Sequence, residues 1–200
     1  KEPEYGKYLQ KAEKASHAKG FVLPYGDSPF DDEPVGETVY MDILNRAKKY
    51  VHIMTPYLII DQSMITALTF AAKRGVDVKL ILPHIPDKKF VFALAKSHYK
   101  ELLKAGVRIY EYTPGFVHAK IFTSDDEKAV VGTINLDYRS LYLHFECAAF
   151  LYQVEEIAEI EKDFQRTLEK CQEVTLENRK KGTFFLRLEG WLLKWLAPLM

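Results

Sequence analysis

The chain has 200 residues, 48% of them hydrophobic, and its 28 basic and 28 acidic residues give a net charge of zero. This composition excludes a disordered chain, and the length is sufficient for one domain with a hydrophobic core. The zero net charge provides no bulk attraction for nucleic acid, so no nucleic-acid partner is expected. The two cysteines lack the spacing of a zinc site.

The first half of the chain is predicted to alternate between strands and helices. Residues 1–33 are assigned to a linker or irregular arm, although the apolar run Phe21–Tyr25 is compatible with a strand. A helical period begins at Glu37. Strands are then predicted at 50–55, 76–82 and 107–112, and helices at 62–73, with Asp61 as N-cap, and at 88–104. This order predicts parallel strands covered by helices.

The pattern changes after Pro114. Antiparallel strands are predicted at Phe116–Thr123 and Lys128–Gly132, joined by the turn Ser124–Glu127. A further strand is predicted at 145–152 and an amphipathic helix at 155–170. The sequence therefore predicts an α/β fold at residues 34–176, in which a mixed sheet is flanked by helices.

Residues 177–200 are predicted to form a C-terminal amphipathic helix. Apolar residues, two of them tryptophans, recur at helical spacing from Thr183 to Met200, with basic residues among them and just before them. This pattern suits the interface of an anionic membrane, and packing on protein is the alternative. No apolar run reaches the roughly 18–20 residues of a spanning helix, so any transmembrane anchor is expected outside this chain, which begins at Lys1.

The first candidate functional residues are His118 and Lys120. On a strand, residues two apart point to the same face, so an imidazole and an ammonium would project together. Such a pair suits a phosphate site, in which the lysine holds the anion and the histidine attacks or protonates. On spacing alone, a half-exposed strand with polar residues outward is the better explanation, because such pairs are common.

Two later segments supply further polar groups. Gly132 ends a strand and would permit close approach to a ligand, and Thr133 and Asn135 follow with groups that can donate to phosphate oxygens. Glu146 lies in an apolar strand, and a buried carboxylate requires a partner. The Nδ1–H of a histidine would serve, and would leave Nε2 free as a nucleophile.

These residues together resemble the signature of the phospholipase D superfamily. The pattern is His118, Lys120, Asp125, Gly132, Thr133 and Asn135, and every spacing matches. The run 132–141 and the segment 144–146 that follows resemble bacterial cardiolipin synthases in particular, and the likeness extends over most of residues 35–200. The resemblance implies a phospholipase D-like α/β/α sandwich.

The resemblance also implies a mechanism. Two such motifs, one from each half of the protein, form one active site that converts two phosphatidylglycerols into cardiolipin and glycerol through a phosphohistidine, without a metal or cofactor. His118 would be the nucleophile or the general acid/base, Lys120 and Asn135 would bind phosphate with Thr133 as a helper, and Glu146 would orient His118. Asp125 belongs to the motif, but its position at a turn favours a structural role.

This chain contains a single such motif, so a missing amino-terminal half or a second copy must provide the other, and the fragment alone is expected to be inactive. The implied partners are a phospholipid substrate and an anionic membrane surface, which places the protein at the bacterial cytoplasmic membrane. The alternatives are a phospholipase D that releases phosphatidic acid, a single-motif dimeric phosphodiesterase or nuclease, and a catalytically silent module.

Overall fold

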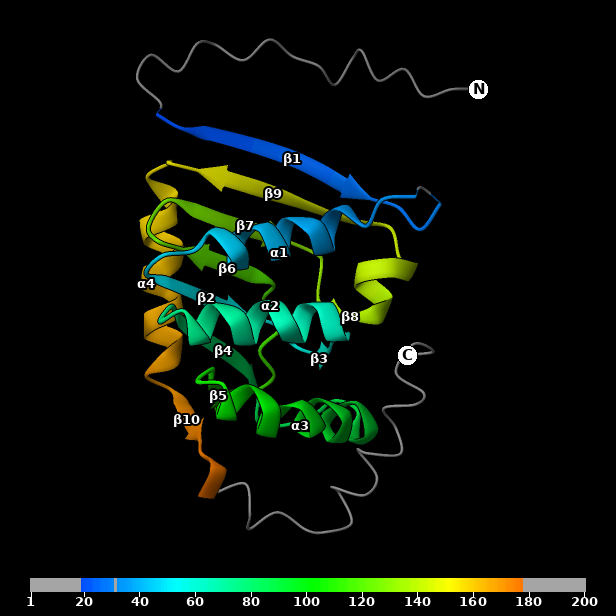
Figure 1. Cartoon of the computed structure of the whole chain (residues 1–200), viewed down its shortest axis with the longest axis vertical. Helices are drawn as coiled ribbons and strands as arrows, with labels where there is room; N and C mark the ends of the chain where they lie inside the picture. Colours follow the sequence, from blue (N-terminus) through cyan, green and yellow to red (C-terminus); the bar gives the residue numbers. More distant parts are fainter. Residues whose placement is uncertain (1–18, 31, 178–200) are drawn as a thin grey trace.

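The chain is built around one eight-stranded mixed sheet with the strand order β1-β9-β7-β6-β2-β4-β5-β10 (Figure 1). The computed structural model describes residues 19–30 and 32–177. The helix predicted for residues 177–200 therefore lies outside the described residues, apart from Glu177.

The bounds of the elements follow the sequence closely. The strands of the large sheet are β1 (Phe21–Asp27), β2 (Tyr50–Met54), β4 (Asp77–Pro83), β5 (Arg108–Tyr112), β6 (Ile121–Ser124), β7 (Lys128–Gly132), β9 (Glu146–Tyr152) and β10 (Cys171–Val174). The helices are α1 (Val35–Arg46), α2 (Gln62–Lys73), α3 (Lys89–Lys104) and α4 (Glu156–Leu168), with a π-helical turn, η2 (Arg139–Leu143). Two short strands, β3 (Leu58–Ile59) and β8 (Leu136–Asp137), pair separately.

Strand direction divides the sheet into two parts. β2, β4 and β5 are parallel neighbours, as the alternation of strands and helices predicts. β6, β7, β9 and β1 continue from β2 as antiparallel strands, and β10 adds an antiparallel strand beside β5. The mixed sheet expected from the sequence is therefore confirmed.

Helices cover both faces of the sheet. Along β2, Ile53 belongs to the larger core cluster, which contains Leu44 of α1 and Leu68 of α2. The next residue, Met54, points to the opposite face and packs in a cluster with Phe164 of α4. Successive strand residues point to opposite faces, so this alternation produces a three-layer α/β/α sandwich.

Local signals placed several elements correctly. α2 has the predicted bounds, and its N-cap Asp61 accepts a hydrogen bond from the amide of Met64 at 2.8 Å. The predicted turn after β6 is confirmed: Asp125 and Asp126 both have positive φ angles, and the amide of Glu127 donates to Ser124 O at 3.0 Å. Two positive φ angles suit the twist of a hairpin.

Two expectations are corrected. The strand predicted at Phe116–Thr123 begins only at Ile121, because β2 and β7 offer partners for Ile121 and the residues after it. β1, which lies within the stretch assigned to a linker or arm, pairs along its whole length with β9, so the sheet begins before residue 34.

Candidate active site

The candidate site lies at one edge of the sheet. The last residue of β2, Met54, pairs with the first residue of the antiparallel strand β6, Ile121. The segment that leads into β6 therefore lies at the carboxyl edge of β2 and its parallel neighbours. This edge is where ligands bind in open sheets with parallel strands.

His118 and Lys120 lie together in this segment, although it is not a regular strand. The Lys120 ammonium donates to the Nδ1 atom of His118 at 2.9 Å and to its backbone oxygen at 2.7 Å. The His118 side chain is exposed, whereas Lys120 is half-buried. The two groups that the sequence assigns to phosphate chemistry are thus adjacent and open to solvent.

Burial and nearby carboxylates act in opposite directions on Lys120. Burial lowers the pKa of the ammonium below its usual value, and the negative charges of Glu146 and Asp137 partly offset this effect. The two carboxylates therefore lie close enough to interact with the ammonium. This ammonium is a positive charge that could bind a phosphate group.

Four of the predicted site residues line one open depression of about 470 Å³. His118 and Lys120 form part of its wall, and Thr133 and Asn135, which follow β7, form another part. The structure brings these side chains together because β7 returns beside β6 to the same edge. An imidazole and an ammonium thus lie in the wall of the same depression as Thr133 and Asn135.

The structure explains why a glycine is needed at position 132: the neighbouring strand β9 lies too close for a side chain. A Cβ atom at this position would lie 2.4 Å from Cys147 O and 2.5 Å from the Cβ atom of Ala148. The glycine therefore allows close approach of β9. The amide of the next residue, Thr133, donates to Cys147 O at 2.9 Å and continues this pairing.

Asn135 is held by the turn that follows it. Its Nδ2 atom lies 3.0 Å from the hydroxyl of Ser140, and the amide of Ser140 donates to Asp137 Oδ1 at 2.7 Å. Burial raises the pKa of Asp137, and the hydrogen bonds from Ser140 and Asn135 only partly offset this effect. Sequence reasoning missed Asp137, because its burial depends on how β8 and η2 fold over the edge.

The carboxylate of Glu146 is held by Thr133, whose hydroxyl donates to Glu146 Oε2. Its other oxygen lies 3.9 Å from Nδ1 of His144, an imidazole that is not among the predicted site residues. No hydrogen bond between Glu146 and His118 is present within residues 19–30 and 32–177. The proximity of Glu146 to Lys120 nevertheless places it beside the depression.

Asp125 occupies the opposite end of β6 from His118. Its carboxylate accepts hydrogen bonds from the amides of Lys48, Lys49 and Tyr50 at 2.8, 2.8 and 2.9 Å. Burial raises the pKa of Asp125, but these donors and the charge of Lys128 outweigh it and hold the pKa below its usual value. The strand β6 lies between Asp125 and the segment that contains His118 and Lys120, and Asp125 does not line the depression.

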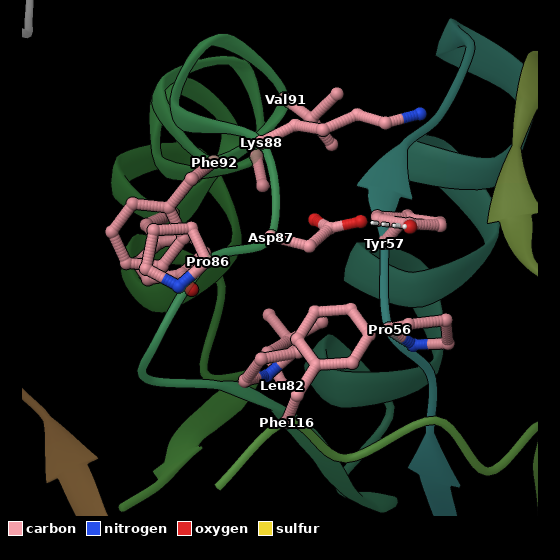
Figure 2. A pocket seen from close by; sticks show the side chains of 12 residues that line it. Pro56, Tyr57, Leu82, Pro86, Asp87, Lys88, Val91, Phe92 and Phe116 are labelled. Carbon is pink, nitrogen blue, oxygen red and sulfur yellow. Dashed lines mark hydrogen bonds between the residues drawn. The ribbon is translucent and has the colours of Figure 1, made fainter.

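A second, apolar hollow adjoins the site through Phe116. The Phe116 ring lies 5.8 Å from the His118 ring and 6.2 Å from the Tyr57 ring. Figure 2 shows Tyr57 donating to Asp87 Oδ2 at 2.6 Å across this hollow, whose other walls include Leu82 and residues of α3. Burial, followed by the contact with Asp87, raises the pKa of Tyr57 to about 12.

Within the described part of the chain, no cluster of three or more His, Cys, Asp or Glu residues is arranged to hold a metal ion. The described helices also include none that is long and apolar enough to span a membrane.

Comparison with known proteins places the chain in a family. Residues 40–168 match the family model described as cardiolipin synthase, PLD-like domain. The chain is 38% identical over 194 residues to cardiolipin synthase 2 of Bacillus anthracis, covering 96% of this chain and 38% of that protein. It is 35% identical over 193 residues to a cardiolipin synthase of Halalkalibacterium halodurans, again covering 96% and 38%. The chain thus spans about two fifths of the length of these relatives.

Two solved structures share the fold. Phosphatidylserine synthase of Haemophilus influenzae superposes with a TM-score of 0.68 at 17% identity, covering 89% of this chain and 45% of that one. The phospholipase D family member Nuc of Salmonella typhimurium superposes with a TM-score of 0.66 at 16% identity, covering 78% and 99%. With a family model that matches most of the folded region, the chain belongs to the cardiolipin synthase family of the phospholipase D superfamily.

Proposed function

We propose that the chain is the carboxy-terminal catalytic half of a cardiolipin synthase, which transfers a phosphatidyl group between two phosphatidylglycerols and yields cardiolipin and glycerol. The main support is the open depression lined by His118, Lys120, Thr133 and Asn135. It offers a nucleophile or proton carrier, a cation and two polar side chains to one phosphodiester. The relatives named cardiolipin synthase support the choice of lipid.

The proposed reaction has two balanced steps. One histidine attacks phosphorus, so that a P–N bond forms while the P–O bond to the headgroup glycerol breaks, and a second histidine protonates the departing oxygen. The second histidine then removes a proton from a hydroxyl of another phosphatidylglycerol, which attacks phosphorus and breaks the P–N bond. His118 takes one of these two roles, and the second motif supplies the other.

The remaining side chains support this chemistry. Lys120 is the charge that stabilises the phosphoryl oxygens, because its ammonium is free to exchange the His118 backbone oxygen for a phosphate oxygen. Asn135 and Thr133 add polar contacts to the same group. Glu146 helps to keep the Lys120 ammonium charged, because its negative charge raises the pKa of that group. Asp125 serves the fold, since its hydrogen bonds go to the backbone before and at the start of β2.

The second motif is proposed to come from the remainder of a longer protein or from a second copy. The length of the relatives, of which this chain spans about two fifths, supports the first source. The substrate is a membrane lipid, so the active protein is proposed to work at the cytoplasmic membrane, with any transmembrane anchor outside this chain.

The test is to supply the full-length protein with phosphatidylglycerol and to identify the lipids by mass spectrometry. Cardiolipin and glycerol in equal amounts are expected. His118→Ala should abolish product, and Lys120→Ala should lower kcat by about 10²–10³-fold, as the loss of a charge-stabilising group does. Phosphatidic acid as the main product would replace transfer by hydrolysis.

His84→Ala is a suitable control, because His84 follows β4 on the same edge but does not line the depression. It should retain most of the activity. Circular dichroism should show that His118→Ala is folded. Near-normal turnover by His118→Ala would exclude this residue from the mechanism.

A further inference from the structure

A basic segment of the chain borders the candidate site. Residues 84–104, which comprise the loop after β4 and all of α3, contain five lysines and two acidic residues, a net charge of +3. The whole chain has a net charge of zero. The segment that begins beside the site is therefore basic, although the composition of the whole chain is neutral.

Apolar side chains are exposed at the start of this segment. Ile85 is 52% exposed and Phe90 is 42% exposed, and Phe116, from the segment before β6, is 37% exposed. Together with Lys88 and Lys89 we call these residues the α3 rim. Exposed apolar groups interspersed with lysines are typical of surfaces that contact anionic membranes.

The fold does not explain the two lysines of the α3 rim. Lys88 is the N-cap of α3 without a side-chain hydrogen bond, and the first turn contains no acidic residue. Positive charges at a helix N-terminus oppose the helix dipole and reduce helix stability. An external negative surface would compensate for this unfavourable placement.

The position of the α3 rim suits a lipid whose phosphate reaches His118. Phe116 belongs to the rim, and its ring lies 5.8 Å from the His118 ring. Lys88 and Phe116 also line the apolar hollow shown in Figure 2. A bilayer on the rim would therefore present its headgroups next to the depression that contains His118 and Lys120.

Another apolar group on this edge fits an anionic surface poorly. Phe30 and Phe145 contact each other with ring centroids 5.4 Å apart, and both are exposed. Asp32 and Glu33 follow Phe30 closely in the loop before α1. Carboxylates repel anionic lipids, so charge complementarity favours the α3 end of the edge.

We infer that the α3 rim is the surface by which the protein docks on an anionic phospholipid bilayer, with Lys88 and Lys89 against the headgroups and Ile85 and Phe90 below them. The choice of a lipid partner rests on the proposed function. The docking itself requires no turnover, so the two can fail separately.

The test measures binding of the full-length protein to vesicles of phosphatidylglycerol and phosphatidylethanolamine by sedimentation. The matched pair is Lys88→Gln with Lys89→Gln against Lys100→Gln with Lys104→Gln, which remove the same charge from opposite ends of α3. One lysine near an anionic surface contributes about 1 kcal/mol, or about fivefold in binding. The first pair should weaken binding about 25-fold, and the second by less than about threefold. All variants keep every other segment that could bind lipid, so a difference between them reports on the α3 rim alone.

A second pair of variants tests the exposed apolar side chains of the α3 rim. Ile85→Ser with Phe90→Ser should weaken binding at both low and high salt, whereas Phe70→Ser, at an exposed position near the end of α2, should not. Equal effects of the two lysine pairs would overturn the inference. The inference would also be overturned if Lys88→Gln with Lys89→Gln left vesicle binding unchanged but lowered the thermal stability. That result would show that another part of the full-length protein covers the α3 rim. A protein that binds through the rim but makes no cardiolipin would retain the inference and refute the proposed function.

Discussion

Replacing Gly132 by alanine should destabilise the sheet next to the site. The added Cβ would lie 2.4 Å from Cys147 O, 2.5 Å from Ala148 Cβ and 2.6 Å from Ala148 Cα, and real Cβ contacts are essentially never shorter than 3.0 Å. The clash involves backbone and a short side chain, so β7 and β9 must separate. Overpacking of this kind costs about 1–3 kcal/mol. For a chain of this size the loss lowers Tm by roughly 3–10 °C.

Gly26→Ala is the matched control, because Gly26 also pairs with β9, opposite Cys147. Its added Cβ would meet only Glu146 O, at the ordinary contact distance of 3.7 Å. Alanine also restricts the unfolded chain, so Gly26→Ala should be neutral or stabilising by about 0.5 kcal/mol. Thermal and urea denaturation of both variants measure the difference. Equal stabilities of the two variants would show that close approach of β9 is not the reason for a glycine at position 132.

Two further predictions concern charged groups outside the depression. Asp125→Asn should lower stability by about 1 kcal/mol at pH 7, because a charged acceptor of three backbone amides is lost. The pKa of Asp125 is lowered in the folded state, so its stabilisation is present above the unfolded pKa of about 3.9 and disappears as the pH falls through the folded value. Denaturation at pH 7 and at pH 3 should therefore show that the difference in unfolding free energy between wild type and Asp125→Asn shrinks at the lower pH. A difference that stays constant would contradict this origin. Glu161→Ala should lower the free energy of unfolding by about 1–3 kcal/mol. The Glu161 carboxylate lies 2.7 Å from Nδ1 of His52 and accepts from the hydroxyl of Thr123, and both groups would lose their acceptor. The exposed Glu159→Ala on the same helix should leave Tm unchanged, and similar losses for both variants would refute a specific role of the buried network.

The sequence was most informative where the signal is local. The helix N-cap Asp61 and the hairpin turn Ser124–Glu127 each depend on residues within three positions of one another, and both were predicted correctly. The pairing limits of β6 depend on where β2 and β7 end, which alternation of residue types does not reveal. The strand therefore begins three residues after His118, although the two polar side chains still converge.

The candidate site shows the same division. His118, Lys120, Thr133 and Asn135 were recognised from residue types and spacing, and they line one space. The hydrogen bond between Thr133 and Glu146 depends on the register of β7 against β9, so the partner of Glu146 was not predictable from its position in the chain. Asp137 was missed because its burial depends on how β8 and η2 fold over this edge, although its partner Ser140 is three positions away. His144 was missed although its neighbour Glu146 is only two positions away.

The spacing of the family motif follows from the geometry of one hairpin. The four residues between Lys120 and Asp125 are the four residues of β6, so the strand spans the sheet from the site to the opposite edge. There Asp125 reaches the amides of Lys48 and Tyr50, and thereby fixes the hairpin to the start of β2. β7 then needs the seven positions up to Gly132 to turn and return, and the amide of Gly132 donates to Lys120 O at 3.3 Å. An insertion in either interval would separate Lys120 from Asn135 or detach Asp125 from β2, so the spacing from Lys120 to Asn135 reflects the width of the sheet.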